Sequence, residues 1–224
     1  MFIHETVKLK YGDLLCETLP TGRTYVTPEG KKYPSITTVL GSEGGQWIHE
    51  WRARVGAEEA NRIGRVAAAR GTSVHSLADK YLNNEEIDVK KLMPNARASF
   101  DALKPALNRV GKIYLQEKAV YSDFLRIAGR LDLVAQFDGK RSVVDFKTSN
   151  RVKKRKDISS YFMQEAGYAI MFEERTGLPI TQLVTIMLVD FYGPIVFIEH
   201  RDTWASELIR IRDNYEEKKL FGKL

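Results

Sequence analysis

The first half of the chain carries apolar residues at helical spacing. They recur every three or four positions over residues 47–69, and again over 74–82 and 96–107, which predicts a helix in each range. The run Gly-Thr-Ser at 71–73 combines a helix breaker with two capping side chains, so it predicts a break between the first two helices. Pro105 should kink the third helix or end it early.

Short strands are predicted before these helices. Residues 22–33 read as a hairpin around a Pro-Glu-Gly turn, because glycine supplies the positive φ that such turns require. Ser35, Thr37 and Thr38 then offer hydroxyl groups that can cap a short helix. The glycines between residues 41 and 45 should end that helix.

After residue 112 the apolar period changes from helical to alternating. The alternation predicts strands over 112–121, 126–137 and 141–147, and Asp138-Gly139 between the last two is a strong hairpin signal. The remaining predicted elements are a helix over 158–175, strands over 182–190 and 195–200, and a helix over 203–219. This order predicts an α/β (α+β) fold, a sheet flanked by helices. We expect a single domain over 1–224, with a hairpin and helical part at 1–110, a sheet core at 111–200 and a C-terminal helix at 201–224.

Composition narrows the class of protein. The chain has 224 residues, of which 43% are hydrophobic and 29% charged, as in soluble globular proteins. No apolar run is long enough for a transmembrane helix, and the first ten residues lack a signal-peptide core, so we expect a cytoplasmic protein. The single cysteine, Cys16, excludes an internal disulfide, a cysteine-based zinc site and a four-cysteine iron–sulfur cluster.

The excess positive charge is concentrated in one stretch. The net charge is +6, and residues 141–160 alone hold seven basic and two acidic side chains. Such a run is usually a solvated loop, but it is also where a polyanion would bind. The basic residues that follow the third strand of the alternating region are Arg151, Lys153, Lys154, Arg155 and Lys156.

Hairpin register brings two carboxylates together. With a two-residue turn at Asp138-Gly139, Phe137 pairs with Lys140, and counting back along the strands sets Asp132 opposite Asp145. Lys147 projects on the same side, because side chains of a strand alternate between faces. Directly opposed residues have Cβ atoms roughly 4.5–5.5 Å apart. Two carboxylates at that distance suit a divalent cation such as Mg²⁺. The competing interpretation is a surface ion pair, and a longer turn would shift the register.

Three further residues could belong to the same site. His75 lies at the predicted start of the helix over 74–82, where a structural role is the commoner one for a lone histidine. Gln164 and Tyr168 are four positions apart and share one face of the helix over 158–175, which would equally suit an ordinary amphipathic surface.

Taken in order, these features resemble the PD-(D/E)XK nuclease superfamily, in its RecB-like branch. Within that branch, the stretches YPSITTVL at 33–40 and RVGAEEA at 54–60 are similar to those of phage exonucleases and of the mitochondrial genome-maintenance exonuclease. Leu131 stands where the family name has proline, and Asp145 replaces the commoner glutamate without changing the type of ligand. The four motifs that carry the resemblance are GTSVH at 71–75, GRLD at 129–132, DFKT at 145–148 and Q-x-x-x-Y at 164–168.

The resemblance implies a restriction-endonuclease-like mixed sheet and a role for each motif residue. Asp132, Asp145 and the Phe146 carbonyl would bind Mg²⁺ or Mn²⁺, with His75 as an additional ligand. Lys147 would be the catalytic lysine, and Gln164 and Tyr168 would line the site beside the DNA. Glu117 is left open between an acidic site residue and a salt-bridge partner, with a slight preference for the latter.

The activity implied is that of a metal-dependent DNA exonuclease, acting on single strands or free ends in replication, recombination or repair. We expect a monomer with DNA as its partner, and replication or recombination proteins as further candidates. Tyr161 and Phe162 could stack on unpaired bases. A structure-specific endonuclease of the same superfamily and a non-catalytic DNA-binding module remain alternatives. Opposed carboxylates argue against the latter, because they repel phosphate.

Overall fold

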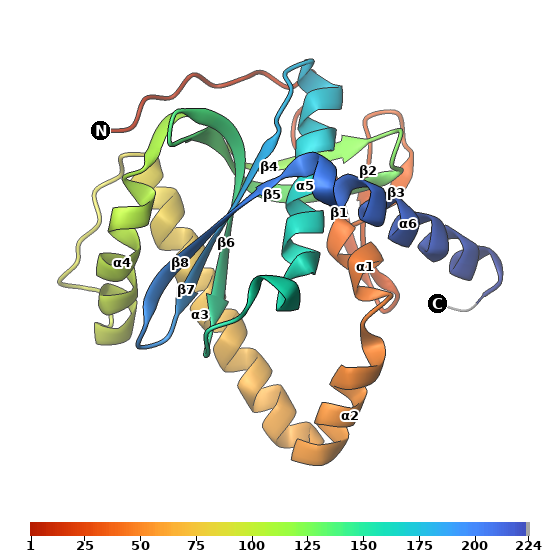
Figure 1. Ribbon diagram of the computed structural model, residues 1–224, viewed down its shortest axis with the longest axis horizontal. Coiled ribbons are helices and arrows are strands. Elements are labelled where there is room, and N and C mark those ends of the chain that lie inside the picture. Colours follow the sequence, from red (N-terminus) through yellow and green to blue (C-terminus); the bar gives the residue numbers. More distant parts are fainter. Residues whose placement is uncertain (223–224) are drawn as a thin grey trace.

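The computed structural model describes residues 1–222, apart from the side chains of residues 45–47 and 49. Its centre is a five-stranded sheet in the order β4-β5-β6-β7-β8 (Figure 1). β6 and β7 are parallel and the other neighbours are antiparallel, so the sheet is mixed, as predicted. The strands are β4 (Val110–Ser122), β5 (Ile127–Phe137), β6 (Lys140–Ser149), β7 (Gln182–Val189) and β8 (Gly193–His200).

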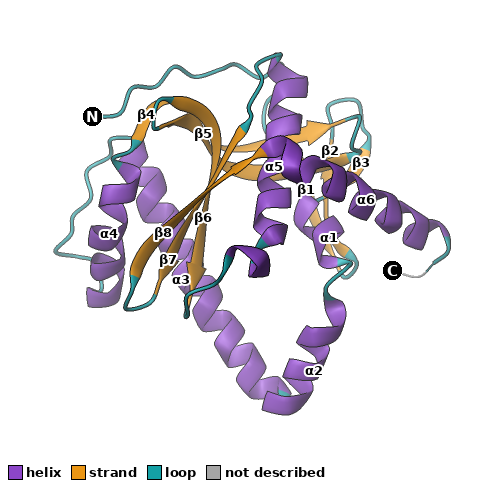
Figure 2. Ribbon diagram, in the orientation of Figure 1, coloured by secondary structure: helices purple, strands orange, loops and turns teal. Residues whose placement is uncertain are grey.

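Helices cover both faces of this sheet (Figure 2). On one face, Val74 and Leu103 of two helices pack in a single core with Val144 of β6. On the other face, Phe172 and Leu208 of two different helices pack with strand residues that include Val143. The helices are α1 (Ile36–Gly41), α2 (Gly45–Val55), α3 (Ala57–Leu82), α4 (Pro94–Leu107), α5 (Ser159–Thr176) and α6 (Arg201–Leu220), with a 3₁₀ turn η1 (Arg155–Asp157). Among the described helices, none is long and apolar enough to cross a membrane.

The β5–β6 hairpin has the register predicted from its turn. Phe137 pairs with Lys140, and the ladder continues to Leu133 opposite Val144. Asp138 and Gly139 both have positive φ, as a two-residue hairpin turn requires. The helix after the hairpin ends at Gly177, whose left-handed φ of 74° allows its N–H to bond the carbonyl of Glu173.

The N-terminal hairpin has one more strand than the sequence predicts. β2 (Gly22–Val26) and β3 (Lys32–Pro34) match the prediction, while β1 (Leu15–Leu19) pairs along the outer side of β2. Every residue of β1 is exposed, so the strand has no buried face and shows no alternating pattern. The short helix α1 begins as predicted, with the Ser35 side chain accepting a hydrogen bond from the Thr38 N–H.

The predicted helix break at 71–73 is wrong. The chain instead breaks at Gly56, whose φ of 87° separates α2 from α3, and α3 then runs unbroken through Gly71, Thr72 and Ser73. A glycine costs a helix only about 1 kcal/mol, and the burial of Val74, Ala78 and Leu82 in the core beneath α3 outweighs that cost. His75 therefore lies in the interior of a long helix rather than at its start. Pro105 does not end α4 early, since the helix continues to Leu107, the end of the predicted range.

Candidate active site

The candidate site lies where β5 and β6 separate. Their ladder stops at Leu133 and Val144, so Asp132 and Asp145 are the first residues beyond it. The Asp132 carboxylate occupies the opening and accepts a hydrogen bond of 2.8 Å from the Phe146 N–H. The carbonyl and N–H of one strand residue point to the same side, so we infer that the Phe146 carbonyl also faces this opening. Charged groups from both faces of the sheet can meet here.

Three potential metal ligands come from three different elements. His75 on α3, Glu117 on β4 and Asp132 on β5 each offer one atom, and these atoms lie within 4.8 Å of one another. His75 Nδ1 lies 3.4 Å from Asp132 Oδ1. Glu117 has a left-handed φ of 46°, a conformation that costs a side-chain-bearing residue about 1–3 kcal/mol. That strain occurs opposite Asp132, between the pairs Gln116–Leu133 and Lys118–Leu131.

The ionisation of this trio reflects burial and mutual charge. Burial disfavours the charged form of His75, but the hydrogen bond and the charge of Asp132 outweigh it and raise the pKa of His75 to about 9. Burial, followed by the negative charge of Asp132, raises the pKa of Glu117 to about 7. Without a bound cation, the cluster therefore holds protons at neutral pH.

Asp145 and Lys147 form a buried ion pair on the side of the sheet that α5 covers. Asp145 is only 2% exposed, and the Lys147 side chain is 19% exposed. Burial raises the pKa of Asp145 to about 6, with Lys147 opposing this effect. Burial also disfavours the Lys147 ammonium, yet the charges of Asp145 and Asp132 outweigh that and raise its pKa. Lys147 is therefore a fixed cation with one side open to solvent.

Gln164 on α5 joins this pair to Tyr168. Its Oε1 accepts a hydrogen bond from Lys147 Nζ at 3.3 Å, and its Nε2 donates to Asp145 Oδ1 at 3.4 Å. The same Nε2 lies 3.3 Å from the Tyr168 hydroxyl. Tyr168 is 3% exposed, so it supports Gln164 from inside the core and has little surface to offer to DNA.

Gly129 makes room for Tyr168. A Cβ at Gly129 would lie 2.8 Å from Tyr168 Cε1 and 3.1 Å from its hydroxyl, closer than real side chains approach. The glycine of the GRLD motif thus has a packing role. It lets the Tyr168 ring lie against β5, and through that ring it fixes Gln164 beside Asp145 and Lys147.

The donor set fits a divalent cation. Around an ion with metal–ligand distances of about 2.1 Å, neighbouring ligands are about 3 Å apart and opposite ligands about 4.2 Å apart. The 3.4 Å between His75 Nδ1 and Asp132 Oδ1, and the 4.8 Å limit on the trio, correspond to such a shell before it contracts around an ion. Carboxylate oxygens suit Mg²⁺, and the imidazole also suits Mn²⁺. Glu117 makes none of the ion pairs found within residues 1–222, so its position beside His75 and Asp132 favours a site residue over the salt-bridge partner that the sequence slightly favoured.

Members of the basic run have different environments. Lys153 Nζ donates to the Tyr161 hydroxyl at 3.1 Å, and Arg155 pairs with Glu199. Arg151, Lys154 and Lys156 are exposed, and none of them takes part in the ion pairs of the described chain. These three cations are therefore free to meet an anion without breaking an internal pair.

The two aromatic residues at the start of α5 differ. Phe162 is fully buried, so the expectation that it could stack on a base is wrong. Its helical position turns it toward Phe197 and Trp204. Tyr161 is half-buried, and its ring centroid lies 5.1 Å from Lys147 Nζ and 5.4 Å from Lys153 Nζ. The ring thus links the site to the basic run.

A buried carboxyl that the sequence did not single out lies behind the site. Glu165 is fully buried on α5, and one of its oxygens accepts a hydrogen bond from the hydroxyl of Thr185, the register partner of Asp145. Burial, followed by the charge of Asp145, raises the pKa of Glu165 well above its ordinary value. A buried carboxyl with a raised pKa is thus packed in the core behind the Asp145–Lys147 pair. The sequence does not indicate this role, because Glu165 lies on a different face of α5 from Gln164 and Tyr168.

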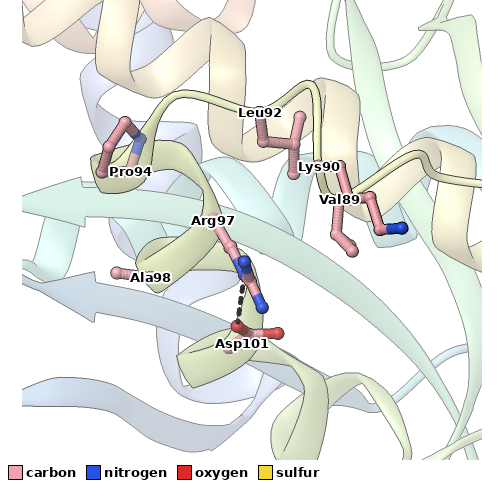
Figure 3. A pocket seen from close by; sticks show the side chains of 7 residues that line it. All are labelled: Val89, Lys90, Leu92, Pro94, Arg97, Ala98 and Asp101. Carbon is pink, nitrogen blue, oxygen red and sulfur yellow. Dashed lines mark ion pairs between the residues drawn. The ribbon is translucent and has the colours of Figure 1, made fainter.

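A depression of about 330 Å³ elsewhere on the surface has a different character (Figure 3). It lies on α4 and the loop before it, and its ion pair joins Arg97 to Asp101 at 3.8 Å. No candidate site residue lines it. Its lining consists of Val89, Lys90, Leu92, Pro94, Arg97, Ala98 and Asp101.

Comparison with known proteins agrees with this geometry. The model of the PD-(D/E)XK nuclease superfamily matches residues 44–191, about two thirds of the chain, and this range contains every candidate site residue. A candidate exonuclease from Eubacterium rectale has a similar structure, with 17% identity, a TM-score of 0.44, and coverage of 70% of this chain and 68% of its own.

The protein SSO0001 is similar at 14% identity and a TM-score of 0.31, over 65% of this chain and 84% of its own. Both TM-scores are too low to add to the assignment, and no curated protein matches the chain. The family match over residues 44–191 is sufficient: this chain belongs to the PD-(D/E)XK nuclease superfamily.

Proposed function

We propose that this protein is a metal-dependent deoxyribonuclease that degrades DNA from strand ends. The observation that carries the proposal is the convergence of His75, Glu117 and Asp132 within 4.8 Å, beside the buried Asp145–Lys147 pair. A non-catalytic binding module has no use for carboxylates that repel phosphate. Asp132, Glu117, His75, Asp145 and the Phe146 carbonyl are the groups that would hold Mg²⁺ or Mn²⁺. When bound, such an ion lowers the pKa of water and stabilises charge on phosphate oxygens.

The chain's own residues have distinct tasks in this proposal. Lys147 remains protonated, so it orients a water molecule and stabilises negative charge on the phosphate instead of acting as a base. Asp145 and Gln164 hold the ammonium in place. Arg151, Lys154 and Lys156 bind phosphates further along the strand, which gives affinity that depends on salt and not on sequence.

Digestion of end-labelled oligonucleotides with Mg²⁺ or Mn²⁺ tests the activity. We expect hydrolysis by the wild-type protein, and a loss of about a hundredfold or more in Lys147→Ala and Asp145→Asn, with DNA binding largely retained. Arg97→Ala, in the depression on α4, is the matched control and should digest DNA normally. Persistent cleavage by both site variants would refute the assignment of these residues.

A covalently closed single-stranded circle tests the requirement for an end. An exonuclease cannot start on a circle, so we expect the linear form alone to be degraded. Cleavage of the circle at a comparable rate would identify an endonuclease of the same superfamily instead. Parallel digestion of single- and double-stranded linear DNA measures strand preference.

A further inference from the structure

The turn between β7 and β8 presents two exposed aromatic side chains. Phe191 is fully exposed and Tyr192 is 69% exposed, although neighbouring residues of β7 are buried. Phe191 also has a left-handed φ of 61°, which is rare for a bulky residue. Single exposed apolar residues are common on protein surfaces, but an adjacent aromatic pair at the tip of a hairpin is a candidate binding surface.

This aromatic tip, Phe191 and Tyr192, lies at the same end of the central strands as the candidate site. β6 and β7 are parallel and end together, and the Asp190 N–H bonds the Ser149 carbonyl at 3.0 Å. Ser149 is two residues beyond Lys147, a distance of roughly 6.6 Å along a parallel strand. Figure 1 shows the β7–β8 turn beside the end of β6. An ion pair between Arg70 of α3 and Asp190 further anchors the base of the tip.

One free cation of the basic run lies at this same end of the sheet. Arg151 is exposed, and its carbonyl accepts a hydrogen bond of 2.7 Å from the Ser149 hydroxyl. The Ser149 carbonyl accepts from the Asp190 N–H at the base of the tip, so Arg151 and the tip are neighbours. The basic run then leads away from the tip, because Arg155 pairs with Glu199 near the other end of β8. Exposed aromatic rings next to an unpaired cation have the chemistry that binds single-stranded nucleic acid, in which phosphates meet the cation and bases stack on the rings.

We propose that Phe191 and Tyr192 form a stacking platform for unpaired bases of the DNA strand that enters the site, and that they favour single-stranded over duplex substrate. This inference rests on the proposed function, since it takes DNA as the substrate. In a duplex the base faces are already stacked on one another, so only an unpaired strand can present them to the two rings.

A matched control exists at another hairpin turn. Phe124, between β4 and β5, is 65% exposed and therefore comparable to Tyr192. It lines a depression in which Glu173 pairs with Arg201 and Glu174 with Arg175, so no free cation lies beside its ring there. Phe124→Ala removes a similar exposed ring without touching the basic edge.

Fluorescence anisotropy in EDTA measures binding without hydrolysis. The probes are a labelled single-stranded oligothymidine, an abasic strand of equal length and a duplex. We expect Phe191→Ala/Tyr192→Ala to lose about tenfold to a hundredfold in affinity for oligothymidine, with little change on the abasic strand or the duplex. Phe191→Leu/Tyr192→Leu keeps the apolar surface but not the aromatic faces, so it should also bind more weakly than wild type. Phe124→Ala should bind as wild type does.

Three results would overturn the platform: unchanged affinity of the alanine variant for oligothymidine, an equal loss on the abasic strand, or wild-type affinity in the leucine variant. Any of these results would show that Phe191 and Tyr192 do not stack on bases. Hydrolysis of bis(4-nitrophenyl) phosphate by the wild-type protein with Mn²⁺ is measured in parallel. If the wild-type protein cleaves neither this diester nor DNA, the proposed nuclease function fails, whatever the binding result.

Discussion

The two halves of the β5–β6 hairpin have different roles, one in stability and the other in the candidate site. From the Asp138–Gly139 turn to Leu133–Val144 the strands are fully paired, and their buried side chains are apolar apart from Ser142. One residue further, the pairing stops. Asp132 lies in the opening, and Asp145 pairs with Lys147 on the face that α5 covers. The paired half contributes stability by removing apolar surface from water. The separated half gathers charges that cost stability without a bound cation, so adjacent positions should respond to mutation in opposite ways.

The largest expected effect is on the separated half. Asp132→Asn removes the charge of a carboxylate whose Oδ1 lies beside His75 and whose Oδ2 accepts a hydrogen bond from the Phe146 N–H, and we expect it to lower hydrolysis by about a thousandfold. The free energy of unfolding without metal should change by less than about 1 kcal/mol, because the substitution also relieves repulsion between carboxylates. Hydrolysis rates and urea denaturation measure the two effects. A loss of stability equal to that of a core mutation would remove the contrast between the halves.

Leu133→Ala tests the paired half at the very next residue. Leu133 is fully buried, so truncation should lower the free energy of unfolding by about 2–5 kcal/mol. The activity per folded molecule should remain within a few-fold of wild type at a temperature well below the transition. Urea denaturation followed by circular dichroism gives the first quantity, and rates corrected for the folded fraction give the second. Inactive but folded protein would show that the two halves are coupled.

Gly129→Ala should have an intermediate effect. Its Cβ would approach Tyr168 to 2.8 Å, and the displaced ring would move Gln164 away from Lys147. We expect about a tenfold loss of kcat with smaller changes in DNA affinity. Gly111→Ala serves as a control, since its nearest neighbour is the flexible end of Gln136 at 3.1 Å, away from the site. Equal losses in both variants would assign the effect to β-sheet distortion instead.

The smallest effect concerns pH. The raised pKa values of Asp145 (about 6), Glu117 (about 7) and His75 (about 9) mean that the metal-free folded state binds more protons than the unfolded state. These groups therefore contribute stability below their unfolded pKa values, and this contribution is lost as pH rises towards 9. Mg²⁺ or Mn²⁺ competes with the same protons, so metal affinity should rise over that range.

Thermal unfolding at pH 5, 7 and 9, with EDTA or with Mg²⁺, measures both trends. We expect the increase in Tm on adding Mg²⁺ to be largest at pH 9. In Asp132→Asn this increase should be small at every pH. A wild-type Mg²⁺ effect that is independent of pH would show that the protonated cluster is not where the ion binds.

The paired and separated halves of the hairpin also differ in how much of each could be predicted from the sequence. The paired half follows from local chemistry, because Asp-Gly selects a two-residue turn and the turn fixes the register. The mixed sheet and most of its helices follow from periodicity for similar reasons. The left-handed conformation of Glu117 on β4, opposite Asp132, does not, because no local pattern in the sequence indicates it. Likewise, the continuity of α3 through Gly71 depends on the packing of Val74 and Ala78 against the sheet, which no local pattern reveals.

The site residues divide along the same line. Asp132, Asp145, Lys147 and Gln164 could be predicted because each belongs to a short motif. The ion pair of Arg155 in the basic run could not be predicted, because its partner Glu199 lies on β8, far along the chain. The buried carboxyl of Glu165 was equally hidden, since its contact with Thr185 crosses from α5 to β7.

Parallel pairing between β6 and β7 has a consequence for how this protein matures. The β5–β6 hairpin needs only a two-residue turn, whereas β7 must return across α5 before it can align with β6. Contacts that close long loops form late in folding, because the chain loses conformational entropy on closing the loop before the new contacts stabilise it. Gln164 and Tyr168 lie within that crossover, so Lys147 gains its support only when the last alignment is complete. A newly synthesised chain should therefore remain harmless to DNA until its folding is finished.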